Sequence, residues 1–232
     1  ADGAFSSLKT IALNCRNLNN DNGAAFFHAE KEFDDLGTSP TIYLRRPFAQ
    51  LNLGTTDKSL EPMTGKVTLT SSLITVKGVA THFNVYEGVG YGNQNVEWVF
   101  GPEVSPKEPV EVPKQALKIG KEPNVQTFVY VSMNYLAVLG DTKAVVDVDA
   151  KIIVNDPAIS GSRTIEHSFT SVPVQENYRT NIVGNLISST TDFNVSIDSE
   201  FDGTYEGNFD GLVVDGANRT ITVLNATGLL GL

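Results

Sequence analysis

The side chains that most often perform catalysis or hold metals are few and scattered in this sequence. Its only cysteine is Cys15, and its three histidines are His28, His82 and His167. None of them stands at a spacing that binds zinc, such as His-x-x-x-His or Cys-x-x-Cys. Cys15 and a distant histidine could form a nucleophile–base pair, but such scattered residues give that pairing no specific support. We therefore expect no catalytic residue, no metal site and no cofactor.

Two other stretches hold suitable residue types without the pattern that the chemistry requires. The run Asp198-Ser199-Glu200-Phe201-Asp202-Gly203 begins like a calcium loop, but Phe209 stands where a bidentate glutamate is needed. We interpret the run as a turn with solvated carboxylates, where calcium would bind only adventitiously. Gly88-Val89-Gly90-Tyr91-Gly92 has the wrong spacing for a dinucleotide loop, and we interpret it as the tip of a hairpin.

Four aromatic residues lie close together in the sequence, namely Tyr86, Tyr91, Trp98 and Phe100. If they were exposed, they would suit a glycan-binding module. On a strand, however, Trp98 and Phe100 share one face, and burial in the core is the commoner fate of that pattern. A hydrolase stays as a further alternative, because the fold alone sets whether two carboxylates lie the required ~5–10 Å apart.

The composition excludes several classes of function. The 232 residues carry a net charge of −10, which disfavours nucleic acid and anionic lipid as partners. Apolar residues make up 41% of the chain, enough for a folded core. No stretch approaches the ~18–20 apolar residues of a membrane helix. Because no initiator Met and no leader stand at the start, we expect a mature or trimmed product.

Short runs with a period of two residues dominate the sequence. The clearest is Ala144–Val154, where alternate residues are apolar and the residues between them include Asp147, Asp149 and Lys151. Such a strand has one dry and one wet face. Similar runs recur throughout the chain, among them Ile74–Ala80, His82–Tyr86, Val125–Leu139 and Phe193–Ile197. No segment has a sustained helical period, and the best helical candidate, Pro113–Ile119, spans a turn or two. This pattern predicts an all-β, antiparallel sandwich.

Prolines mark two interruptions between the predicted strands. Residues 101–123 contain five prolines, which remove strand hydrogen bonds, and we interpret them as a long connection within one domain. Arg45-Arg46-Pro47 separates two predicted strands and is a candidate boundary after a first domain.

Three stretches, taken together, resemble the fimbrillin-like pilins and cell-adhesion proteins of the Bacteroidales. They are Leu44-Arg45-Arg46-Pro47-Phe48-Ala49-Gln50-Leu51-Asn52-Leu53-Gly54, Val129-Tyr130-Val131-Ser132-Met133-Asn134-Tyr135-Leu136, and Val172-Pro173-Val174-Gln175-Glu176-Asn177-Tyr178-Arg179-Thr180-Asn181-Ile182-Val183-Gly184-Asn185-Leu186-Ile187. The resemblance covers roughly residues 1–205, and we interpret the residues of these stretches as architectural.

The resemblance implies two transthyretin-like sandwich domains, of which the first looks incomplete here. It divides the chain into residues 1–46 as part of an N-terminal β-domain, 47–205 as a C-terminal sandwich, and 206–232 as an extension or donor segment. It also implies export as a lipoprotein precursor, proteolytic trimming, and assembly into a fimbrium on the outer membrane surface by strand exchange. The implied partners are other pilin subunits, in a homo- or hetero-polymer, and a host surface glycan or protein is a further candidate.

The apolar residues near the C-terminus suit a donated strand, which must satisfy an open edge and an apolar groove of a neighbour. The candidate donor residues are Leu212, Val213, Val214, Ile221, Val223, Leu229 and Leu230. The ending after Gly203 departs from the family's usual one. The alternative function is therefore a stalk or glycan-binding module that does not polymerise, within a larger surface adhesin.

Overall fold

The fold consists almost entirely of β-strands. The computed structural model describes residues 10–15, 46–56, 67–101, 113–140, 142–188 and 193–198, and the backbone alone of residues 41–43, 206–209, 212–215 and 220–223. In these residues no helix is long and apolar enough to cross a membrane. A single turn of 3₁₀ helix, η4 (Pro157–Ile159), joins two strands. The prediction of an all-β, sandwich-like fold is confirmed, while its transthyretin-like topology stays a prediction.

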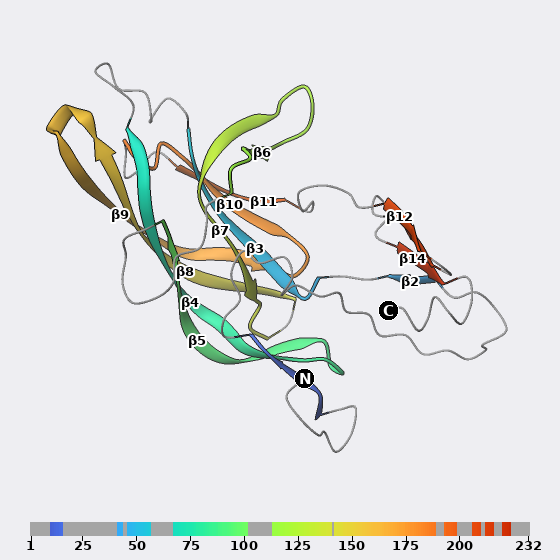
Figure 1. The fold of residues 1–232 in the computed structure, drawn as a ribbon. Helices are drawn as coiled ribbons and strands as arrows, with labels where there is room; N and C mark the ends of the chain where they lie inside the picture. Colours follow the sequence, from blue (N-terminus) through green and yellow to red (C-terminus); the bar gives the residue numbers. More distant parts are fainter. Residues whose placement is uncertain are drawn as a thin grey trace.

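The first sheet is built around the longest strand, β4 (Thr68–Asn84). One side of β4 pairs with β5 (Val89–Phe100) in a long hairpin. The other side pairs first with β8 (Lys143–Asp156) and then, nearer the hairpin end, with the short β1 (Ala12–Asn14). β9 (Gly161–Gln175) pairs with β8 and completes this antiparallel sheet, which Figure 1 shows as a strongly twisted layer.

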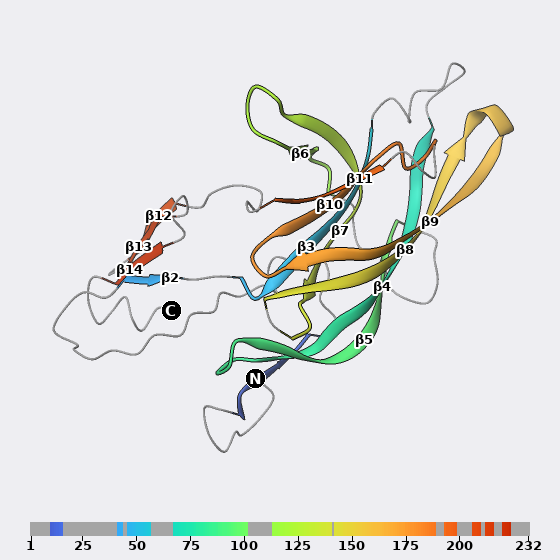
Figure 2. The same ribbon diagram turned by 180° about the vertical axis from the view of Figure 1, so that it is seen from behind.

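The second sheet has the order β11-β10-β3-β7-β6. Its strands are β3 (Phe48–Thr55), β6 (Leu117–Ile119), β7 (Gln126–Ala137), β10 (Arg179–Gly184) and β11 (Phe193–Asp198). All neighbours are antiparallel except β3 and β10, which run parallel in the middle of the sheet. Figure 2 shows these strands layered beside the first sheet.

A third, smaller sheet pairs residues 41–43 with strands near the C-terminus. It has the order β12-β13-β14-β2, with β2 (Thr41–Tyr43), β12 (Glu206–Phe209), β13 (Leu212–Asp215) and β14 (Thr220–Val223). Figures 1 and 2 show it apart from the two larger sheets. β2 thus pairs with the C-terminal segment, whereas β1 belongs to the first sheet. The division into residues 1–46, 47–205 and 206–232 stays a prediction.

The main core lies between the two larger sheets. It combines inward residues of the first sheet, such as Ile74 and Val148, with inward residues of the second, such as Leu51 and Ile182, all 0% exposed. Trp98 and Phe100 belong to it, as their shared face predicted. The alternation in Ala144–Val154 has the same cause, because Val146, Val148, Ala150, Ile152 and Val154 are buried in this core.

The second sheet is also covered on its outer face. Leu117 of β6 packs there against Phe128, Met133 and Val183. A Cβ on Gly54 would lie 2.9 Å from Leu117 Cδ2 and 3.1 Å from Phe128 Cβ, so glycine lets β6 approach. Both faces of β3 are therefore covered, and all eight of its residues are buried.

Two local expectations need correction. The best helical candidate, Pro113–Ile119, contains no helix and ends in the short strand β6, where pairing with β7 overrides its weak local preference. The runs Ile74–Ala80 and His82–Tyr86 are not separate strands, because both lie largely in the continuous β4. A shift in register between Lys77 and Val79, where Gly78 has a φ of 89°, lies inside the first of these runs.

Asn134 is a buried polar residue in this core, and a substitution can test what its burial costs. It lies opposite Leu51, so its amide faces the apolar core, where neither amide atom has a hydrogen-bond partner in the described structure. Asn134→Leu keeps the number of side-chain heavy atoms and removes this desolvation cost. We expect the free energy of unfolding to rise by about 1–3 kcal/mol in urea denaturation.

The matched control is Leu51→Asn, which places a second amide on the same face and should lower stability. A fall in stability for Asn134→Leu would show that the amide makes hydrogen bonds that the replacement cannot supply.

Candidate functional site

The outer edge of the second sheet is formed by β11. Its six residues pair in register with β10, from Arg179 opposite Asp198 to Gly184 opposite Phe193. Among the described strands β10 is its sole partner. The backbone N–H and C=O groups on the outer side of β11 are therefore oriented to pair with a further strand.

β11 also carries an apolar row that is only partly covered. Phe193, Val195 and Ile197 alternate along the strand and share the face that looks toward the first sheet. Val195 packs against the main core, and the Phe193 ring meets Phe169 of β9 edge to face, with centroids 4.7 Å apart. Nevertheless, 39% of Phe193 and 42% of Ile197 is exposed. Over Phe193–Ile197 this edge thus combines apolar side chains with a backbone that pairs with one strand, β10, among the described strands.

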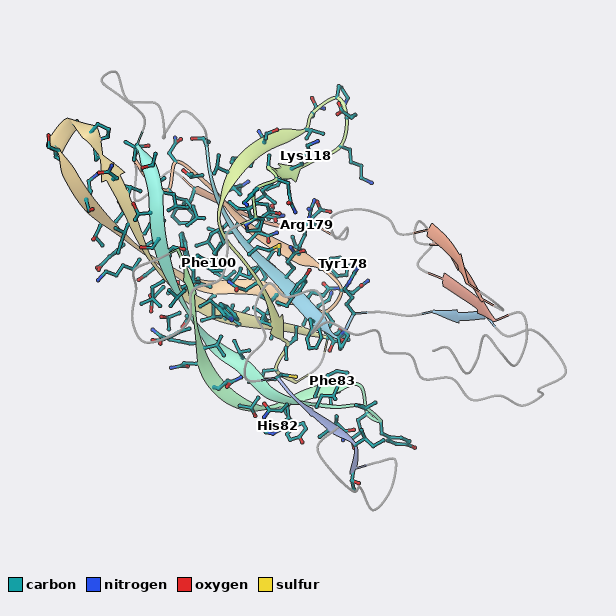
Figure 3. All side chains as sticks on the ribbon, in the orientation of Figure 1. His82, Phe83, Phe100, Lys118, Tyr178 and Arg179 are labelled. Atoms are coloured by element: carbon teal, nitrogen blue, oxygen red, sulfur yellow. The ribbon has the colours of Figure 1, made fainter. Side chains whose placement is uncertain are left out.

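Arg179 anchors β11 to the rest of the sheet. Its side chain is buried, and Nη2 donates to Oδ2 of Asp198 at 2.9 Å and to the carbonyl oxygen of Lys118 at 3.1 Å. Figure 3 shows Arg179 lying beside Lys118, where β6 crosses the outer face. One guanidinium therefore joins β10, β11 and β6, and its charge is balanced by a carboxylate.

Buried amides continue this polar row across the sheet. Asn52 of β3 lies beside Asn181 of β10, and its Nδ2 donates to Oδ1 of Asn181 at 2.8 Å. Gln50 occupies the position beside Arg179 in the same register. All of these side chains are buried. The row therefore holds strands together and does not form a solvent-facing polar site.

The predicted donor residues lie in the small sheet as far as the structure describes them. Leu212, Val213 and Val214 are in β13, and Ile221 and Val223 are in β14. The backbone register sets Leu212 opposite Val223 and Val214 opposite Ile221. β13 and β14 have neighbours on both sides within the chain. Leu229 and Leu230 lie outside the described residues, and donation by any of these residues stays a prediction.

The chemistry-bearing residues do not assemble into a reactive centre in the described part of the chain. Cys15 is buried, and its thiol contacts the carbonyl oxygen of Leu13 at 3.7 Å. His167 is buried against Phe169, with its Nε2 2.6 Å from the carbonyl oxygen of Leu186. No group of three His, Cys, Asp or Glu residues suited to a metal occurs among the described residues. His28 and the acidic run after Asp198 lie outside them.

Sequence reasoning identified β11 as a strand but missed its place at the sheet edge. Its apolar alternation was visible, yet strand order depends on pairings between distant segments. The Arg179–Asp198 pair was equally hidden, since nothing local links those residues. The available signal was the absence of Lys, Pro or Gly from Phe193–Asp198, because protected edge strands usually contain such residues.

The fold and this edge define an all-β sandwich protein. The chain belongs to DUF6562, a family of unknown function whose model matches residues 4–224. A comparison with curated proteins found no match.

The similar solved structures include an assumed cell adhesion protein from Bacteroides eggerthii, with a TM-score of 0.38 and 12% identity over 82% of this chain and 69% of that one. One from Bacteroides ovatus has a TM-score of 0.29 and 11% identity, covering 65% and 42%. One from Bacteroides fragilis has a TM-score of 0.28 and 12% identity, covering 71% and 48%. The chain spans less than half the length of the last two. All three are named as cell adhesion proteins, which is the class of protein that the sequence resembles.

The contribution of the Arg179–Asp198 pair can be measured by removing one partner. Arg179→Met removes the counter-charge that Arg179 provides to Asp198, whose side chain is 24% exposed, and the donor to the carbonyl of Lys118. We expect the free energy of unfolding to fall by about 3–5 kcal/mol in urea denaturation.

The control is Lys77→Met, which removes an ion pair with Asp149 whose side chains are 48% and 43% exposed. Solvent screens that pair, so stability should hardly change. Equal effects of the two substitutions would contradict an anchoring role for Arg179.

The Cys15 thiol offers a second measurement. Burial raises the pKa of Cys15 to about 11, so at pH 8 only about one molecule in a thousand carries the thiolate. We expect a disulfide reagent such as DTNB to react slowly with the native protein and rapidly in urea. Rapid stoichiometric labelling of the native protein at pH 8 would argue for a reactive cysteine.

Proposed function

We propose that this chain is a structural and adhesive subunit of a cell-surface fimbria that joins its neighbours by β-strand donation. The observation that carries the proposal is the outer edge of β11. Strand donation needs an acceptor with an open strand edge and apolar side chains within reach. Among the described strands β11 pairs on one side alone, and Phe193 and Ile197 supply the half-exposed apolar side chains. The cell-adhesion names of the similar solved structures add support.

The donor in this proposal is an apolar segment near the C-terminus of a neighbouring copy. β13 and β14 already pair on both sides, so donation from Leu212–Val214 or Ile221–Val223 requires the small sheet to open. A segment around Leu229 and Leu230 lies beyond these strands in the sequence and is the second donor candidate. Because donor and acceptor surfaces differ, the contact is head to tail and grows into a fibre instead of closing.

The proposal places the protein outside the cell on the outer membrane surface, after export as a lipoprotein precursor and trimming. Its partners are other pilin subunits, with a host surface glycan or protein bound by the assembled fimbria. It assigns the chain no enzymatic activity. The second candidate function is a stalk module that does not polymerise, which the pairing of β14 with β2 within one chain favours.

A charge on the acceptor edge tests the proposal. Ile197→Lys sets a lysine among the apolar residues of β11, and desolvating it would oppose the addition of a strand. We expect the wild-type protein from its native surface to form filaments or SDS-resistant ladders, and the variant to remain monomeric in size-exclusion chromatography and negative-stain microscopy.

Ile159→Lys is the matched control, because Ile159 is 59% exposed but lies in η4, away from the sheet edge. It should assemble like the wild type. Normal filaments from Ile197→Lys would exclude β11 as acceptor, and a monomeric wild type would favour the stalk module.

A further inference from the structure

The tip of the β4–β5 hairpin is an ordered turn. The side-chain Oδ1 of Asn84 accepts from the backbone N–H groups of Tyr86 at 3.0 Å and Glu87 at 3.1 Å. Its Nδ2 donates to the Glu87 carboxylate at 3.1 Å, and its carbonyl accepts from the N–H of Gly88 at 2.9 Å. Gly88 has a φ of 69°, which glycine adopts without strain. Asn84 thus fixes the turn from Val85 to Gly88.

The hairpin end is also held from one side. Phe83 is buried with Cys15, Ala80 and Tyr135 in a small core of its own, and Val85 packs against it. The N–H of Val85 donates to the carbonyl oxygen of Ile11 at 3.0 Å, beside β1. Figure 3 shows Phe83 turned toward the sandwich and His82 on the opposite side of the hairpin. One face of the tip is therefore anchored, while the other is presented to solvent.

Two tyrosines are exposed on this tip. Tyr86 is 41% and Tyr91 is 44% exposed. Tyr91 lies opposite His82 on the neighbouring strand, and the two rings stack with centroids 5.2 Å apart and planes at 17°. Nδ1 of His82 lies 2.8 Å from Oγ1 of Thr81, which fixes the ring orientation. The Tyr91 ring is therefore positioned before any ligand arrives.

We propose that this tip binds a neutral saccharide through Tyr91 and Tyr86. The apolar C–H face of a pyranose stacks on an aromatic ring, and a tyrosine adds a hydroxyl that bonds to sugar hydroxyls. Planar polar side chains complete such a site, and the exposed Asn93 and Asn95 supply them along the same hairpin. The proposal does not depend on strand-mediated assembly.

The residue types at the tip select this ligand over the alternatives. From residue 79 to residue 96 the sequence contains no Lys or Arg. The cation across from this stretch, Lys77 opposite Asn95, is already paired with Asp149 at 2.8 Å, which leaves it less able to balance a phosphate, sulfate or sialic acid. The Glu87 carboxylate would repel such groups. Two rings are also too few for a stable protein–protein interface, which buries about 800 Å² on each partner. A small neutral ring with several hydroxyl groups fits both limits.

The test is titration calorimetry of the full chain with cellohexaose, maltohexaose and mannohexaose, and with a sialylated oligosaccharide for comparison. We expect at least one neutral oligosaccharide to bind at millimolar concentration or below. Tyr91→Ala and Tyr86→Ala should each weaken that binding about tenfold, the scale of one lost aromatic anchor. Tyr91→Phe keeps the ring and should retain most of the affinity.

Three comparisons make the test decisive. Circular dichroism checks that each variant folds, and Ile159→Ala provides a control for loss of an exposed apolar side chain elsewhere. Ile197→Lys, which targets assembly, should bind the oligosaccharide like the wild type. The proposal is overturned if no neutral oligosaccharide binds, if only the sialylated one binds, or if both alanine variants bind normally.

Discussion

The parallel pairing of β3 with β10 is the constraint on which the rest of the fold depends. Asn52 and Asn181 are 129 residues apart in sequence, yet their amides share a buried hydrogen bond at the centre of the second sheet. Adjacent parallel strands require a crossover connection, and here all four long strands of the first sheet lie between them in sequence. The chain must therefore build the first sheet against the second in order to close this pair, which makes the two layers interdependent.

This central pair also determines which strands lie at the edges of the sheets. These edge strands differ in how well they are protected from pairing with a further strand. β9 is approached by the segment after β10, since Nη1 of Arg163 donates to the carbonyl of Ile187 at 3.1 Å. β5, an edge strand of the first sheet, carries the amides Asn93, Gln94 and Asn95 and the charged Glu97. β11 instead has two half-exposed apolar residues and a single charge, which Arg179 already neutralises. Among the described edges, β11 therefore lacks the features that normally prevent strand addition.

The sequence predicted local structure well because alternation records which face of a strand is buried. Ala144–Val154 and Phe193–Ile197 fall in β8 and β11, and Val125–Leu139 contains β7. Alternation does not record partners, so neither the parallel pair nor the edge position of β11 could be inferred from it. The aromatic residues show the same limit. Shared spacing predicted burial of Trp98 and Phe100, but the exposure of Tyr86 and Tyr91 depends on where the hairpin extends past its neighbours.

That extension explains how a binding tip can coexist with a stable sandwich. β8 accompanies β4 only as far as Lys77, and beyond it β1 supports the remainder of the hairpin from His82 to Asn84. The tip has its own small core around Phe83, so the exposed rings contribute little to the main core between the sheets.

Figures 1 and 2 show the tip and β11 well separated. Strand addition at β11 would leave Tyr91 accessible, and a polymer of such subunits would repeat the tip along its length. Repetition raises the avidity of weak individual contacts without any new interaction. Weak saccharide binding at the tip and fibre formation at β11 would then reinforce each other in adhesion.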